Sequence, residues 1–359
     1  MPPSGMPDTP FLHVDPARLD RNLAAMAGWA ERHGVRLRPH AKTHKCVRVA
    51  QRQLAAGAVG LTVATIGEAE VFADAGFDDL FVAYPLWLSE DKARRLRALA
   101  GRVTLTVGAD SVEGVRRLAE GLGGAPVGVL VEIDSGMHRS GVPADSVVSV
   151  ADAARDAGLT VAGVFTFPGH GYGLDTARAD AAEQEARSLA VAANALRDNG
   201  IDVSVVSGGS TPTARLADPG VVTELRPGVY VFNDAQQLEL GSCGIDDIAL
   251  TAVSTVVSAS GSRVVLDAGS KILGADRPGW TTGFGRLADH LDARLVSLSE
   301  HHAVAEFPPA AVVPEVGDRV RVIPNHVCTA VNLVDELFAG PDPYGELESW
   351  PVAARGANS

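Results

Sequence analysis

The sequence is poor in the features that mark a secreted or membrane-spanning protein. It has three cysteines in 359 residues, Cys46, Cys243 and Cys328, which are too few and too scattered for a disulfide framework. It has no stretch of about 18 uninterrupted apolar residues. Its first ten residues lack the basic and apolar regions of a secretory signal. We therefore expect a cytoplasmic protein that does not enter a membrane.

Positive charge is also scarce. The chain has 31 Lys and Arg against 44 Asp and Glu, which gives a formal net charge of −13. Nucleic-acid binding draws on clustered positive charge, so this balance argues against a nucleic-acid partner.

The rest of the composition is that of an ordinary globular protein. Hydrophobic residues make up 46% and charged residues 21% of the chain, which excludes a largely disordered protein. The sequence has no internal repeat and no low-complexity tract. A chain of this length usually divides, so we expect one domain of roughly 200–250 residues and a smaller one.

Short β-branched runs alternate with helical segments over the first two thirds of the chain. This alternation is typical of βα units around a parallel sheet. The expected strands are Val35–Arg38, Gly60–Ala64, Asp79–Ala83, Val103–Val107, Val127–Ile133, Val161–Phe165, Val203–Val206 and Tyr230–Phe232. Eight such strands predict a (β/α)8 barrel over residues 16–240, with a doubly wound sheet as the alternative.

The pattern changes after Asp234. The runs Leu250–Ser258, Ser262–Asp267, Asp292–Ser297 and Arg319–Ile323 are separated by Gly, Pro and Asp, without long helical periods between them. They predict a mostly antiparallel β domain over residues 241–359, which residues 1–15 could join through the run Phe11–Val14.

The segment from Arg36 to Lys45 is the most unusual in the chain. Its sequence, RLRPHAKTHK, places His40 and Lys42 at the end of the first expected barrel strand. A lysine at that end of the strand faces the mouth of the barrel, where it can form a Schiff base. The alternative is a solvated basic loop.

A second segment suits a phosphate group. Ser207, Gly208, Gly209, Ser210 and Thr211 follow the seventh expected strand, in the usual position of a barrel's phosphate site. Together with Lys42, this segment suggests pyridoxal 5′-phosphate as cofactor, although a Gly-Gly pair alone is equally typical of a plain turn. The segment Leu225–Tyr230 could complete the phosphate site, with Tyr230 as a further contact.

Arg139 follows the fifth expected strand. A guanidinium keeps its proton, so Arg139 could tune the cofactor ring as a fixed cation. The alternative is a surface turn in which Arg139 pairs with Asp134.

His326 and Cys328 form the third candidate group. On a strand, residues i and i+2 share a face, so an imidazole and a thiolate would converge there. Such a pair suits Zn²⁺ with part of its coordination sphere open, without excluding Mn²⁺ or Co²⁺. The alternative is that Cys328 is a buried packing residue.

With these residues in place, the chain resembles the alanine-racemase-like, fold-type III pyridoxal-phosphate enzymes. More narrowly, it is similar to the metal-dependent D-serine dehydratase and D-threonine aldolase family, over nearly the whole chain. The most specific segments are RPHAKTHK at residues 38–45 and PNHVCT at residues 324–329. The resemblance implies a Schiff base on Lys42, a metal on His326 and Cys328, and a head-to-tail homodimer. It also implies that His302 lies near the metal.

Two positions depart from the family pattern. The aldolases carry His-x-Asp at the metal position, so Cys328 here looks more like the dehydratases. Many relatives also place a tyrosine near the cofactor where this chain has Phe167, which cannot donate a hydrogen bond. His170 or Tyr172 could take over that contact.

The resemblance leaves two lyase reactions open on a small D-3-hydroxy amino acid. Loss of the β-hydroxyl would give a keto acid and ammonia, with Lys42 removing the Cα proton. Retro-aldol cleavage, with His302 or His170 as the base, would give glycine and an aldehyde. We favour dehydration because of Cys328. A racemase would need a tyrosine from the β domain, which offers Tyr344 alone, and a non-catalytic pyridoxal-phosphate carrier would lack that domain.

Overall fold

The computed structural model describes residues 7–359 and divides into two compact units. One unit, the barrel unit, contains residues 26–42, 50–228 and 356–359. The other, the β unit, contains the described residues up to Ala25, residues 43–49 and residues 229–355. The change of sequence pattern predicts a division at residue 240, whereas the two compact units divide the chain between residues 228 and 229. Helices α1 (Pro16–His33) and α2 (Val47–Ala55) each run from one unit into the other.

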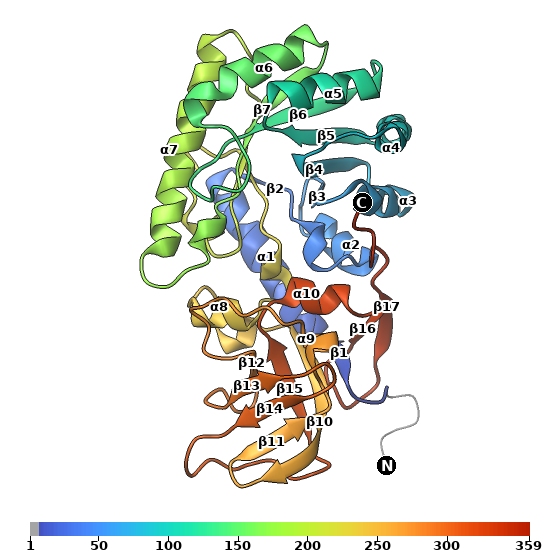
Figure 1. Ribbon diagram of the computed structural model, residues 1–359, viewed down its shortest axis with the longest axis vertical. Coiled ribbons are helices and arrows are strands. Elements are labelled where there is room, and N and C mark those ends of the chain that lie inside the picture. The colour runs from blue at the N-terminus through green and yellow to red at the C-terminus, as the bar shows by residue number, and fades with distance from the viewer. Residues whose placement is uncertain (1–6) are drawn as a thin grey trace. The chain divides into compact units, whose positions relative to one another are not determined.

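The barrel unit contains, within the described residues, an eight-stranded sheet with parallel pairing throughout (Figure 1). Its strands are β2 (Arg36–Leu37), β3 (Leu61–Val63), β4 (Asp79–Pro85), β5 (Thr104–Ala109), β6 (Val127–Glu132), β7 (Thr160–Phe165), β8 (Val205–Gly208) and β9 (Glu224–Leu225). The two end strands meet through a parallel bridge between His40 and Thr62 and a hydrogen bond from the Thr62 N–H to the Pro39 carbonyl. The predicted (β/α)8 barrel is thus confirmed.

The barrel's helices pack in chain order around the sheet, each against the next (Figure 1). They are α3 (Ile66–Asp74), α4 (Glu90–Ala100), α5 (Val112–Leu122), α6 (Val147–Asp156) and α7 (Ala177–Asp198). Side chains of Thr65, Ser89 and Ser111 accept hydrogen bonds from the first turns of α3, α4 and α5, which fixes where these helices begin. Inside the barrel, Phe81 and Phe165 meet edge to face with their ring centroids 5.0 Å apart.

The eighth strand was predicted at the wrong place. Tyr230–Phe232 is not a barrel strand, because Val229–Val231 forms a 3₁₀ turn, η5, in the β unit. The eighth strand is β9, which is two residues long and ends before Arg226. Pro227 and Gly228 end the sheet there. Short buried apolar runs occur in helical turns as well as in strands. The composition of Val229–Phe232, which is buried, therefore does not distinguish the two, and this explains the error.

The β unit contains a mostly antiparallel nine-stranded sheet within the described residues. Its strands are β1 (Phe11–Val14), β10 (Leu250–Ser260), β11 (Arg263–Leu266), β12 (Gly285–Leu287), β13 (Arg294–Leu298), β14 (Ala303–Glu306), β15 (Arg319–Pro324), β16 (Glu336–Ala339) and β17 (Glu348–Pro351). Strand β1 lies between β10 and β16, antiparallel to the first and parallel to the second. The N-terminal run therefore joins the β unit, which also contains the short helices α8 (Ala235–Glu239), α9 (Ser270–Leu273) and α10 (Val327–Asn332).

No helix in residues 7–359 is both long enough and apolar enough to span a bilayer.

Candidate active site

The candidate cofactor residues of the barrel unit follow the carboxyl ends of five different strands. Lys42 lies in the 3₁₀ turn η1 (Ala41–Thr43) after β2, and Arg139 and Phe167 follow β6 and β7. Gly208 and Gly209 lie at the end of β8, and Arg226 follows β9. In barrels, the carboxyl ends of the strands carry the active site.

Phe167 contacts both candidate cations of this face. The Nζ atom of Lys42 is 5.5 Å from the centroid of the Phe167 ring, and Cζ of Arg139 is 5.2 Å from the same centroid. A small cleft is lined by Arg139 and Phe167 together with Glu132 and Thr166. The structure therefore brings Lys42, Arg139 and Phe167 together, as their positions after the strands predict.

His40 and His170 have different surroundings. His40 is buried, and its N–H donates to the Pro227 carbonyl at 3.0 Å, which ties the turn before Lys42 to the chain after β9. His170 lies in the 3₁₀ turn η3 (Gly169–Gly171), with Nε2 2.9 Å from Oε1 of Gln184. Its Nδ1 is buried without a hydrogen-bond partner among the described residues.

The segment Ser207–Thr211 forms a compact turn with little room for side chains. A Cβ at Gly209, whose φ is +80°, would lie 2.7 Å from Cδ2 of Leu225. The Ser210 N–H donates to Oγ1 of Thr213 at 3.0 Å. The hydroxyl of Ser207 is fully buried and bonds to Glu224 and Arg226, so it supports the turn from within the barrel.

A chain of charged side chains runs through the barrel interior, where branched apolar residues are usual. Arg38 bonds to Asp79 and, through Nε, to Oε2 of Glu224 at 2.9 Å. Glu224 accepts from Ser207 at 2.8 Å, and Ser207 accepts from Nε of Arg226 at 2.9 Å. Arg226 also donates to the carbonyl of Thr166.

This chain of charges fixes a backbone atom next to the cofactor face. The guanidinium of Arg226 lies 5.6 Å and 5.2 Å from the centroids of the Phe81 and Phe165 rings, which hold it in place. Because Thr166 directly precedes Phe167, the bond from Arg226 to the Thr166 carbonyl fixes the turn on which the Phe167 ring is presented.

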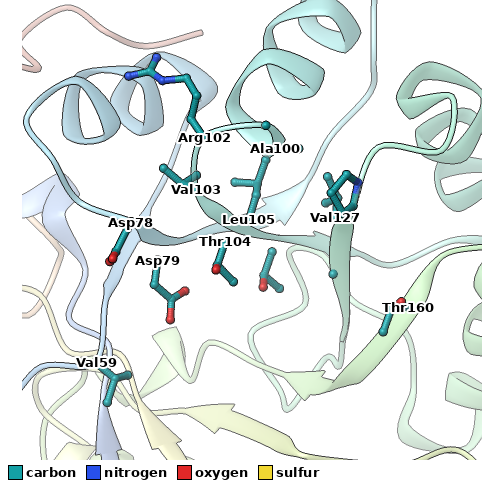
Figure 2. Close-up of a pocket in the computed structure, with 14 residues that line it drawn as sticks. Val59, Asp78, Asp79, Ala100, Arg102, Val103, Thr104, Leu105, Val127 and Thr160 are labelled. Carbon is teal, nitrogen blue, oxygen red and sulfur yellow. The ribbon is translucent and has the colours of Figure 1, made fainter.

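A cavity of about 860 Å³ lies at the opposite ends of the barrel strands. Figure 2 shows it lined by residues from the starts of neighbouring strands, including Asp79 of β4 and Thr104 of β5, which pair in register. Asp79 is bound by Arg38. None of the candidate cofactor residues lines this cavity, and the amino ends of barrel strands serve stability rather than catalysis.

The candidate metal residues lie in the β unit, but not on a strand as predicted. Strand β15 ends at Pro324, and His326 is the N-cap of helix α10 with an extended backbone (φ −133°, ψ 107°). Cys328 lies in the first turn of that helix. The two side chains still converge, because the thiol of Cys328 is a hydrogen-bond partner of the His326 imidazole.

Two residues that the sequence pattern does not point to contact the pair of His326 and Cys328. Oδ2 of Asp234 lies 3.5 Å from Nδ1 of His326 and accepts the Val327 N–H at 3.1 Å. Thr43 is fully buried, and its Oγ1 accepts from Sγ of Cys328 at 3.2 Å. Burial lowers the pKa of His326, but Cys328 and Asp234 outweigh it and hold the pKa well above its usual value. The anionic neighbours that cause this also favour a bound cation.

The described residues contain no larger group of potential metal ligands. Within residues 7–359, no group of three or more His, Cys, Asp or Glu side chains is placed to hold a metal ion. His302 is exposed and precedes β14, and its carbonyl accepts the Ser299 N–H at 2.8 Å. Tyr230 is buried in η5 of the β unit. The roles of His302 and Tyr230 remain predictions.

The residues present fit both groups that the sequence suggested. Lys42 supplies a primary amine beside an aromatic ring and a fixed cation. A Cβ at Gly208 would lie 2.5 Å from Glu185 and one at Gly209 2.7 Å from Leu225, so the turn takes only glycine, whose backbone N–H groups suit a phosphate. Imidazole and thiolate are the donors that zinc prefers. Asp234 faces Nδ1 of His326, which leaves Nε2 for a metal.

Comparison with known proteins agrees with this arrangement. Residues 14–236 match the family "Alanine racemase, N-terminal domain", and residues 249–339 match "Putative serine dehydratase domain". A D-threonine aldolase from Arthrobacter sp. is 34% identical over 99% of this chain and 97% of its own. A D-threo-3-hydroxyaspartate dehydratase from Delftia sp. (strain HT23) is 37% identical over 96% of each chain.

The chain belongs to this family of alanine-racemase-like enzymes, which includes D-serine dehydratase-like proteins and D-threonine aldolases. The solved structure of the Delftia dehydratase is 33% identical and covers 96% of this chain and 97% of its own, with a TM-score of 0.88. That of a D-threonine aldolase from Filomicrobium marinum is 32% identical, with a TM-score of 0.83, and covers 97% of this chain and 96% of its own.

Proposed function

We propose that this protein is a pyridoxal 5′-phosphate- and divalent-metal-dependent lyase that dehydrates a D-3-hydroxy amino acid to a keto acid and ammonia. The observation that carries the proposal is the pairing of His326 with Cys328 at two-residue spacing, supported by Asp234 and Thr43. D-threo-3-hydroxyaspartate dehydratase has been solved with a histidine or with a cysteine two positions further on replaced by alanine, and the cysteine mutant is in the metal-free form. The matching spacing supports the same metal site here.

Each group would supply one part of the reaction. When bound, the cofactor withdraws electrons from Cα, and the metal stabilises the departing hydroxide as a Lewis acid. The metal would bind to Nε2 of His326 and Sγ of Cys328. Zn²⁺ is the metal to test first. Thr43 is fully buried and bonds to Cys328, which supports a role for Thr43 in holding the metal pair.

The remaining steps belong to side chains of the barrel unit. We assign to Nζ of Lys42 the removal of the Cα proton, since it lies on the cofactor face beside Phe167. Arg139 also contacts the Phe167 ring, and its guanidinium would place a fixed positive charge beside the cofactor ring. The Cα proton and the β-hydroxyl leave together as water, and hydrolysis of the resulting enamine gives the keto acid and ammonia.

Retro-aldol cleavage is the second candidate. It is favoured by His170, the candidate base, whose buried Nδ1 has no hydrogen-bond partner among the described residues. The D-threonine aldolase and a 3-hydroxy-D-aspartate aldolase from Paracoccus denitrificans, 32% identical over 97% of this chain, are relatives of this kind. We propose dehydration as the main activity because the metal pair contains Cys328.

We further propose a cytoplasmic homodimer, as the family resemblance implies.

Chelation tests the metal assignment. Treatment with EDTA should abolish keto-acid release while the visible absorbance of bound pyridoxal 5′-phosphate remains, and added Zn²⁺ should restore activity. Full activity in protein shown by elemental analysis to contain no metal would overturn the roles given to His326 and Cys328.

A further inference from the structure

Glu185 is a carboxyl group in a place that packing alone would give to an apolar residue. It lies on α7 with 1% of its surface exposed, one helical turn from the buried residues Ala181 and Leu189. A buried carboxyl costs free energy unless its oxygens find partners, so its presence on this stripe requires an explanation.

One oxygen of Glu185 holds the glycine turn at the end of β8. Oε1 accepts the Gly209 N–H at 2.7 Å. A Cβ at Gly208 would lie 2.5 Å from the same oxygen, so the carboxyl approaches the turn as closely as glycine allows. Leu225 contacts the turn from the other side. The turn is thus held between α7 and β9.

The second oxygen serves no packing or hydrogen-bonding purpose in the described structure. Oε2 is buried without a hydrogen-bond partner among residues 7–359. An apolar side chain would fill this volume at lower cost if only packing were needed. The bond to Gly209 is therefore the contact that accounts for an oxygen acceptor at this position.

We propose that Glu185 is a positioning residue for the cofactor phosphate: by accepting the Gly209 N–H, it holds the Gly208–Gly209 turn in the conformation that receives the phosphate. This inference rests on the proposed binding of pyridoxal 5′-phosphate. It concerns the phosphate end of the cofactor alone, and Lys42 acts at the other end.

The charge around Glu185 suits this role. Burial raises the pKa of Glu185 to about 7, although the Gly209 N–H and the charge of Arg226 oppose the rise. A carboxyl that holds a proton more readily keeps Oε1 as an acceptor without placing a full negative charge under a phosphate. Arg226 is the cation that faces it from the end of β9.

A pair of cofactors separates phosphate positioning from general folding. The apoprotein is titrated with pyridoxal 5′-phosphate and with pyridoxal, which lacks the phosphate, and both dissociation constants are measured by absorbance. Glu185→Leu, which removes the acceptor, should weaken phosphate-cofactor binding about tenfold while changing pyridoxal binding less than about twofold. Glu185→Gln, which keeps Oε1, should bind both cofactors as the wild type does.

Two further variants keep the test decisive. If Glu185→Leu fails to fold, Glu185→Asp withdraws the oxygen by one methylene and should show the same selective loss. Glu183→Gln changes an exposed carboxyl on the same helix and is the control, expected to alter neither constant.

Equal weakening of both cofactors in the Leu and Asp variants, or unchanged affinity for the phosphate cofactor, would overturn the role of Glu185. Failure of the wild type to bind pyridoxal 5′-phosphate would overturn the proposed function, and this inference with it.

Discussion

The Sγ atom of Cys328 lies 3.2 Å from Oγ1 of Thr43, the residue that directly follows Lys42 in the chain. Thr43 is completely buried, so its hydroxyl has no access to solvent and is directed to the sulfur. Once Cys328 is a thiolate, the hydroxyl donates to it. A hydroxyl in this position orients the thiolate and lowers the cost of its charge, as partners of metal ligands commonly do.

Replacing Thr43 should therefore weaken the metal site without removing a ligand. Thr43→Val keeps the shape of the side chain and deletes the hydroxyl, and we expect metal affinity to fall about tenfold. Thr43→Ser retains the hydroxyl and is the matched control. Competition with a fluorescent zinc chelator gives both affinities, and equal affinities for the Val variant and the wild type would refute the role of Thr43.

Lys42 should be required for the visible absorbance of the bound cofactor. Lys42→Ala removes the amine that lies beside Phe167, so addition of pyridoxal 5′-phosphate should give no protein-linked band near the visible edge. Lys92→Ala, on the barrel helix α4, should retain the band. A persistent band in the Lys42 variant would mean that another lysine binds the cofactor.

The metal preference should follow the ligand at position 328. Cys328→Asp replaces a soft sulfur donor with a hard oxygen donor, which lowers affinity for Zn²⁺ relative to Mn²⁺. We expect the ratio of the two affinities to fall at least about tenfold, as measured by metal competition on the purified protein. An unchanged ratio would show that Cys328 is not a ligand.

Glu185 should make stability depend on pH. Its pKa is about 7 in the folded protein against 4.5 for the free group, because burial disfavours its charge. The folded state then binds more protons than the unfolded state between these values, so stability falls as pH rises from about 4.5 to 7. The loss over the whole transition is about 3 kcal/mol.

The melting temperature of the apoprotein, measured from pH 5 to pH 8, checks this dependence. Glu185→Gln should lose less stability over that range than the wild type, and Glu183→Gln should follow the wild type. Parallel curves for Glu185→Gln and the wild type would contradict the shifted pKa.

Much of the fold follows from local sequence pattern. The barrel strands β3 to β7 are five apolar runs whose neighbours are amphipathic helices, and Ser89 and Ser111 mark where two of those helices begin. The placement of Lys42 and Arg139 near the same ring, Phe167, is predictable because residues that follow parallel strands lie at one face. Glu185 also had a local signal, a carboxyl at four-residue spacing from Ala181 and Leu189.

The rest depends on contacts that no local pattern contains. Strand β9 has two residues and is recognisable only by its pairing with β2 and β8, so the sequence pattern favours Tyr230–Phe232 instead. Asp234 caps α8 with one oxygen, a locally visible role, but its second oxygen binds the N–H of Val327, 93 residues away. The bond from Cys328 to Thr43 spans 285 residues.

The central claim is that the metal pair serves removal of the β-hydroxyl, and D-threonine tests it most directly because both reactions act on it. The purified protein, loaded with pyridoxal 5′-phosphate and Zn²⁺, is incubated with D-threonine, and the products are separated by chromatography. We predict 2-oxobutanoate and ammonia in equal amounts, without glycine. Glycine and acetaldehyde as the main products would contradict the account.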